Sequence, residues 1–140
     1  MEVDYKLVLS IIAICISLYS VWGNRRISAL EKKTEIMSEL DEIRSLIFKT
    51  YREFDNLVRV KDVMPKEFNE AVNEGVIALN FFHDQLEAAS STMLVQKKIS
   101  KVKLEENRPM VKRMIRDAQK LLDDSIAMNN RALKLCKQGK

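Results

Sequence analysis

Residues 7–23 read LVLSIIAICISLYSVWG, a run of seventeen positions without a charged side chain. Lys6 precedes the run, and Arg25 and Arg26 follow it closely. Seventeen residues of α-helix rise about 25 Å, which is at the short end of what crosses the hydrocarbon core of a membrane. Trp22 stands where aromatic residues anchor at the level of the headgroups. The run therefore predicts one transmembrane helix near the N-terminus.

A buried core helix and a cleaved signal peptide are the two alternatives for this run. A core helix of such purity does not fit a chain whose other helical segments are all amphipathic. A signal peptide carries a basic n-region and small residues at its cleavage site. Here the first six residues include Glu2 and Asp4, and the nearest small-residue site ends at Gly23, before two arginines. We expect the span to be retained.

The charges that flank the span predict its orientation. Glu2 and Asp4 precede it with one lysine, and the basic residues Arg25, Arg26, Lys32 and Lys33 follow it. Positive charge is retained on the cytoplasmic side, so the N-terminus should lie outside. We expect a single-pass protein of the inner (plasma) membrane of a bacterium. Residues 1–26 would form a short outer tail and the span, and residues 27–140 a cytoplasmic domain.

One face of the span gathers small and polar residues. At 100° per residue they fall within an arc of about 80°, and they are Ser10, Ala13, Ser17, Ser20 and Asn24. Small residues let helix backbones approach, so this stripe predicts a helix–helix interface in lipid. It can instead line a narrow polar pore in an oligomer, or arise by chance. Because the chain has no second apolar run, the partner would be another copy or another protein.

The rest of the chain has the composition of an all-helical protein, with three glycines and two prolines in 140 residues. Apolar residues recur at steps of three and four, which predicts helices at about 27–62, 66–90 and 109–136. Proline positions suggest the boundaries, with Met64–Pro65 between the first two helices and Asn107–Pro109 at the start of the third. Residues 91–106 are left open as a basic turn, an edge strand or a loop.

The predicted fold class is all-α, with the transmembrane helix continuing into a cytoplasmic antiparallel helical bundle. No proline interrupts residues 7–64, so the span should pass into the first bundle helix without a break. Gly75 is expected to mark a close crossing of two helices. The predicted inner faces include Ile36, Leu40, Ile43, Ile47, Tyr51, Phe54 and Val58, then Phe68, Val72, Leu79, Phe82 and Leu86, and then Met114, Ala118, Leu122, Ile126, Ala132 and Leu133.

Basic residues provide the candidate binding sites of the predicted cytoplasmic domain, and the whole chain carries a net formal charge of +4. The candidates for binding an anionic ligand or lipid are Lys97, Lys98, Lys101, Arg113, Arg116 and Lys120. Two interpretations stay open, a solvated face near anionic lipid and a pocket for a phosphate-rich ligand. Nucleic-acid binding is not expected, because no aromatic residues are interleaved for stacking.

No pattern in the sequence predicts catalysis, a metal or a cofactor. The scattered glycines cannot form a phosphate-binding loop. The single histidine, His83, stands beside Asp84, and neighbouring residues on a helix diverge by 100°, so the two are not a preset dyad. No Cys/His spacing suits zinc. Cys15 and Cys136 lie too far apart to pair and are expected to be free thiols.

The segment from Asn130 to Cys136 resembles the motif of the HEPN ribonucleases. These all-helical proteins carry an arginine, four to six intervening residues and a histidine near the end of a late helix. Arg131 matches the arginine, whereas Cys136 stands at the position of the histidine. A thiol does not replace imidazole as the acid/base group of RNA cleavage. We therefore expect no enzymatic activity.

These observations predict a membrane-anchored helical protein that homo-oligomerises and acts as a non-enzymatic assembly or scaffold. The expected partners are membrane lipids, further copies of the chain, and an anionic ligand or protein partner. The alternative is an oligomeric, pore-forming or membrane-perturbing effector controlled by such a ligand at its cytoplasmic bundle. In layout, that alternative is similar to the small membrane-anchored accessory effectors of bacterial antiviral, CRISPR-linked systems. A holin-like protein is disfavoured by the predicted cytoplasmic domain.

Overall fold

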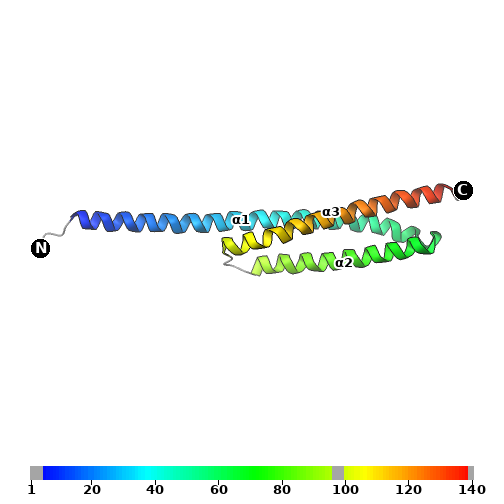
Figure 1. The fold of residues 1–140 in the computed structure, drawn as a ribbon, viewed down its shortest axis with the longest axis horizontal. Helices are drawn as coiled ribbons and strands as arrows, with labels where there is room; N and C mark the ends of the chain where they lie inside the picture. Colours follow the sequence, from blue (N-terminus) through cyan, green and yellow to red (C-terminus); the bar gives the residue numbers. More distant parts are fainter. Residues whose placement is uncertain (1–4, 96–99, 139–140) are drawn as a thin grey trace.

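The computed structural model describes the backbone of residues 5–95 and 100–138, and the surroundings of the side chains of residues 11–95 and 100–137. Its elements are α1 (Tyr5–Val60), the short 3-10 helix η1 (Lys61–Val63), α2 (Lys66–Val95) and α3 (Lys101–Gln138). The chain runs up, down and up again, so that α2 is antiparallel to its two neighbours (Figure 1). Every element among these residues is a helix, which confirms the predicted all-α helical bundle.

α1 is one helix of 56 residues, about 84 Å long at 1.5 Å per residue. The prediction that the apolar run continues into the first bundle helix without a break is confirmed. Its N-terminal part extends alone beyond α2 and α3 (Figure 1). Among the residues described, no helix combines the length and the apolar character needed to cross a membrane.

The turn between α1 and α2 follows from Pro65. A proline drives the residue before it away from helical angles, and Met64 is extended, with φ −102° and ψ 159°. The Pro65 carbonyl then accepts hydrogen bonds from the N–H groups of Phe68 and Asn69, at 3.0 and 3.2 Å. The predicted boundary between the first two helices is therefore present.

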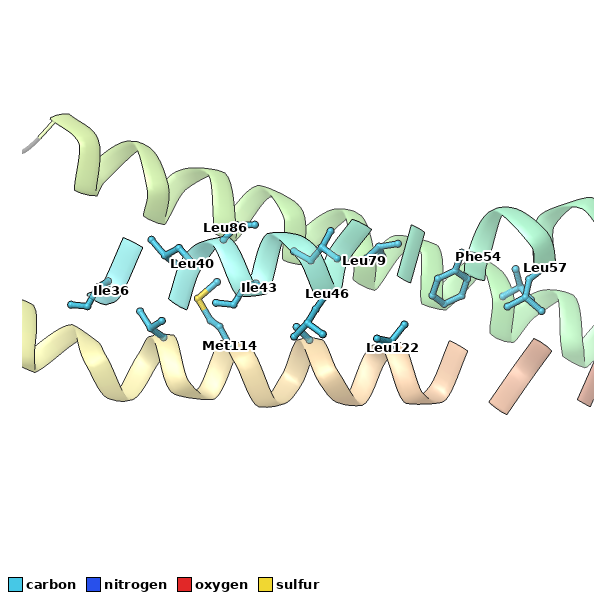
Figure 2. Packing of buried hydrophobic residues seen from close by; sticks show 14 of the residues in the cluster. Ile36, Leu40, Ile43, Leu46, Phe54, Leu57, Leu79, Leu86, Met114 and Leu122 are labelled. Atoms are coloured by element: carbon cyan, nitrogen blue, oxygen red, sulfur yellow. The ribbon is translucent and has the colours of Figure 1, made fainter. Parts of the chain in front are cut away.

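α1 is the central helix of the bundle, because it packs along both α2 and α3 whereas these two contact each other little. In Figure 2, Ile43 and Leu46 of α1 lie between side chains of the two other helices. The core extends from Ile36 at one end of the bundle to Leu57 near the other, and both are fully buried. A helix that contacts two neighbours buries a wide face, which explains why Leu46 and Leu57 join the predicted inner stripe.

Four residues assigned to the inner faces are exposed instead, and these assignments are wrong. They are Tyr51, Val58, Ile126 and Leu133, which are 37%, 40%, 41% and 60% exposed. Tyr51 points to the surface, where its hydroxyl donates a 2.7 Å hydrogen bond to Asn80 Oδ1.

Two polar residues, Thr50 and Ser125, are buried in the core. Each hydroxyl donates a hydrogen bond to a carbonyl of its own helix, at 2.8 and 2.7 Å. Periodicity alone does not reveal such satisfied hydroxyls.

The predicted start of the third helix at Asn107–Pro109 is wrong, because α3 already begins at Lys101 and includes Pro109. Leu104 is fully buried and belongs to the hydrophobic core, which holds the early turns of α3 against the bundle. The Asn107 amide donates a 3.0 Å hydrogen bond to the carbonyl of Lys103, within the helix rather than as a cap. Of the segment left open, residues 91–95 and 101–106 are helical and 96–99 lie outside the described residues.

At Gly75, where a close helix crossing was expected, the ring of Phe54 on α1 lies directly against the glycine. A Cβ atom at this position would lie 2.5 Å from Cε1 of the Phe54 ring on α1, and closer still to Cζ. Phe54 is 3% exposed, so neighbouring side chains hold its ring in place. The Phe54 ring therefore occupies the space that a side chain at residue 75 would need.

We expect Gly75→Ala to destabilise the bundle. In an open helix this change adds about 1 kcal/mol of stability, but overpacking a core costs about 1–3 kcal/mol. A net loss of about 1 kcal/mol should appear in thermal unfolding of the full chain in detergent, followed by circular dichroism.

Gly23→Ala is the matched control, because a Cβ at Gly23 meets nothing within 4 Å. It should leave stability unchanged or raise it. Adding Phe54→Leu to Gly75→Ala should recover part of the loss. A Gly75→Ala protein that is more stable than the parent would contradict tight packing of the Phe54 ring on Gly75.

Candidate functional site

The small-residue stripe lies on the part of α1 that projects from the bundle. Ala13, Ser17, Ser20 and Asn24 are exposed, and Ser10 belongs to α1 although its side chain lies outside those described. All side chains from residue 11 to residue 22 are exposed. The stripe lies along α1, and no other described part of the chain covers it. Another chain could therefore reach it.

The basic candidates do not form one cluster. Lys97 and Lys98 lie outside the described residues, and Lys101 stands at the first position of α3. The other three are exposed on α3, where Arg113 lines a groove facing α2, Arg116 lines a separate hollow and Lys120 lines neither. The Arg113 Nε atom lies 3.8 Å from Asp117 Oδ2, so its charge is partly compensated.

The residues that could take part in catalysis do not form an active-site cluster among the described residues. Arg131 and Cys136 are both exposed, and five residues along a helix place them about 140° apart around the axis of α3. The nearest ring nitrogen of His83, Nδ1, is 3.6 Å from Asp84 Oδ1, beyond hydrogen-bonding distance. Within the part of the chain that the structure describes, no three His, Cys, Asp or Glu side chains gather as metal ligands would.

An apolar groove of about 820 Å³ runs between α2 and α3 because these helices diverge on one side of α1. Alanine and methionine side chains make up much of its lining. Phe81 of α2 and Met110 of α3 border it and are 63% and 51% exposed. Sequence reasoning missed this groove, because helical periodicity does not tell how far apart two helices lie.

A second groove, of about 1210 Å³, lies where α3 begins beside α1. Four basic residues and no acidic residue line it. Trp22 lines it as well, and Arg26 stacks over the indole with its Cζ 5.9 Å from the ring centroid. We call it the basic groove, and the side chains that matter below are Trp22, Arg25, Arg26, Lys33, Lys101 and Val102.

Deeper in the bundle, charged side chains of α1 and α3 form ion pairs. Arg108 of α3 bridges to Glu35 on α1 and lies 3.7 Å from Glu39 Oε1. The Lys32 ammonium lies 3.0 Å from the other Glu35 oxygen. Its hydrogen bond holds the pKa of Glu35 below the usual value, Arg108 adds to this lowering, and partial desolvation opposes it.

We expect Glu35 to make the bundle sensitive to acid. A carboxyl with a lowered pKa contributes stability above its unfolded value of 4.5, and this contribution is lost as the pH falls through the folded pKa. Glu35→Gln should therefore lower the midpoint of urea unfolding at pH 7, and the difference from the parent should shrink below pH 4.5.

The control is Glu31→Gln, which changes an exposed glutamate one helical turn earlier on α1. Its unfolding midpoint should follow that of the parent at every pH. A Glu35→Gln protein with the same pH profile as the parent would show that the contacts with Lys32 and Arg108 do not stabilise the fold.

No protein-family model, curated protein or solved structure matches this chain. Three features of the molecule bear on its function. They are the projecting apolar part of α1, the apolar groove between α2 and α3, and the basic groove.

Proposed function

We propose that this chain is a single-pass, membrane-anchored helical protein that homo-oligomerises and acts as a non-enzymatic assembly or scaffold. One observation carries the proposal. The projecting part of α1 exposes a continuous series of large apolar side chains that no other described part of the chain covers, namely Ile11, Ile12, Ile14, Ile16, Leu18, Val21 and Trp22.

The magnitude of the hydrophobic effect supports burial of this segment outside the bundle. Fully burying an isoleucine, leucine or valine side chain contributes about 1.5–3 kcal/mol. These side chains are about half exposed, Ile12 at 48% and Leu18 at 65%. Completing their burial in lipid or against other chains therefore contributes about 1 kcal/mol each. The sum is comparable with the about 5–15 kcal/mol that stabilises a whole domain.

The charges along α1 support lipid as the surroundings of this segment. The uncharged run begins at Leu7, four residues before the first described side chain, and ends at Gly23. Arg25 and Arg26 follow within one turn, where positive side chains meet headgroups on the cytoplasmic side. The bundle would then lie in the cytoplasm, with the N-terminus outside.

Self-association is supported by surfaces in both parts of the chain. The stripe with Ser17 and Ser20 would pair helices in the membrane, where small residues permit close packing. The groove beside Phe81 would bury apolar surface between neighbouring bundles. Anchoring copies in one membrane raises their effective concentration, so a modest contact in the bundle suffices. A pore lined by the stripe stays a sequence-based alternative.

Membrane anchoring predicts that Ile16→Arg releases the chain from membranes. An arginine at the centre of a span costs about 2.5–3.5 kcal/mol in insertion. The matched control is Phe48→Arg, because Phe48 and Ile16 are both 64% exposed but Phe48 lies on the bundle part of α1. The parent and Phe48→Arg proteins should resist alkaline extraction from cell membranes, while much of the Ile16→Arg protein is released. Equal release of all three would contradict the anchor.

Self-association through the apolar groove predicts that Phe81→Asp weakens the oligomer. Light scattering in a mild detergent should report a smaller assembly, since a carboxylate would be buried at the contact. Phe48→Asp is again the control, with an equally exposed phenylalanine outside the groove, and it should keep the parental size. An unchanged size for Phe81→Asp would exclude the groove as the contact, and a monomeric parent would exclude oligomerisation.

A further inference from the structure

We propose that the basic groove between α1 and the start of α3 binds the phosphate headgroup of an anionic phospholipid. The inference rests on the proposed membrane anchor, since the groove meets lipid only if the projecting part of α1 is embedded. A groove with walls from α1 and from the start of α3 would hold a single headgroup, whereas scattered basic residues only attract an anionic surface in general.

The position of the groove along α1 matches headgroup depth. Its α1 wall runs from Trp22 to Lys33, so it begins where the uncharged run ends at Gly23. Arg26 lies about 4–5 Å beyond Gly23 along the helix axis. Tryptophan is the residue type that anchors at this level of a bilayer.

The second wall comes from a distant part of the sequence. Ser100, Lys101 and Val102 line the groove at the start of α3. The N–H of Lys103 donates a 3.4 Å hydrogen bond to Ser100 Oγ, which holds the first turn in place. The N-terminus of α3 is the positive end of its helix dipole, so it adds to the positive potential in the groove. No acidic residue in the first turn of α3 offsets this contribution.

Three of the four basic side chains that line the groove lack a carboxylate partner among the described residues. Arg25, Arg26 and Lys101 have no carboxylate within 4.0 Å among the described residues. In the adjoining bundle, by contrast, Lys32 and Arg108 both contact Glu35. Several cations from two elements therefore converge on a space that an anion would occupy.

Apolar side chains beside the cations favour a lipid over a free anion. Leu30 and Val102 line the groove and are 56% and 65% exposed, and Trp22 is 60% exposed. Inorganic phosphate would contact only the charged groups. A phospholipid places its phosphate at the cations and its glycerol and upper acyl carbons against these apolar surfaces, which buries both kinds of group.

The experiment uses Trp22, the only tryptophan of the chain. The full-length protein is placed in nanodiscs of phosphatidylcholine doped with either brominated phosphatidylglycerol or the same amount of brominated phosphatidylcholine. Bromine quenches indole fluorescence at short range. We expect stronger quenching by the brominated anionic lipid, and high salt should weaken this preference.

The variants separate a site from diffuse attraction. Lys101→Gln leaves the arginines that orient the span and should lower the preference about fivefold, which is the ratio for about 1 kcal/mol per cation near an anionic surface. Arg25→Gln with Arg26→Gln and Lys101→Gln should abolish the preference. The control combines Lys49→Gln, Arg52→Gln and Lys120→Gln, which remove the same charge from exposed positions outside the groove and should preserve it.

Three other results would each overturn a different part of the proposal. Equal quenching by the two lipids, or equal effects of both triple variants, would overturn the headgroup site while leaving the anchor intact. Removal of the preference by soluble glycerol phosphate would reassign the groove to a free phosphate compound and overturn the lipid assignment. A chain that does not co-elute with nanodiscs would instead overturn the proposed anchor.

Discussion

The constraint on which the other features depend is the continuity of α1 from Tyr5 to Val60. No proline interrupts this helix, and Gly23 causes no break in it. The backbone hydrogen bonds therefore run from the projecting part into the bundle, where Ile36 and Leu57 are fully buried. A tilt or rotation of the projecting part has to be shared by the bundle, since an uninterrupted helix has no hinge. If the projecting part is embedded as proposed, its orientation in the membrane and the orientation of the bundle are thereby coupled.

The packing of α2 and α3 on α1 explains where the two grooves lie. α1 packs against both α2 and α3, and the core lies along these two contacts. Because α2 and α3 contact each other little, an apolar groove remains between them. The same arrangement brings the start of α3 beside the point where α1 leaves the bundle. A bundle with a central long helix thus creates one apolar and one basic groove, at different depths relative to the proposed membrane.

Much of the fold follows from the sequence, because helix periodicity and proline positions are local signals. The turn at Met64–Pro65 and the continuity of α1 were predictable for that reason. The early start of α3 was not, since burial of Leu104 and the contact of Arg108 with α1 outweigh the local signal of Pro109. Tertiary contacts override local preference at such positions. The stripe of the span was visible in the sequence alone, and its role remains a prediction.

The basic groove could not be found in the sequence. Arg25 and Arg26 indicate only the orientation of the apolar run, and Lys101 belongs to a series of lysines along the chain. Only packing of α3 against α1 places Lys101 beside the end of the apolar run. The apolar groove depends in the same way on the separation of α2 and α3, which no periodic pattern encodes.

The most direct measurement of the central claim uses the two native cysteines, which are both exposed in the isolated chain. Cys15 lies within the uncharged run and Cys136 near the end of α3. The full-length protein in nanodiscs, which leave both membrane faces open to solvent, is treated with a water-soluble maleimide. Embedding of α1 predicts that Cys136 is labelled while Cys15 is protected until the protein is denatured. Labelling of both thiols at the same rate in the intact nanodisc would contradict the account.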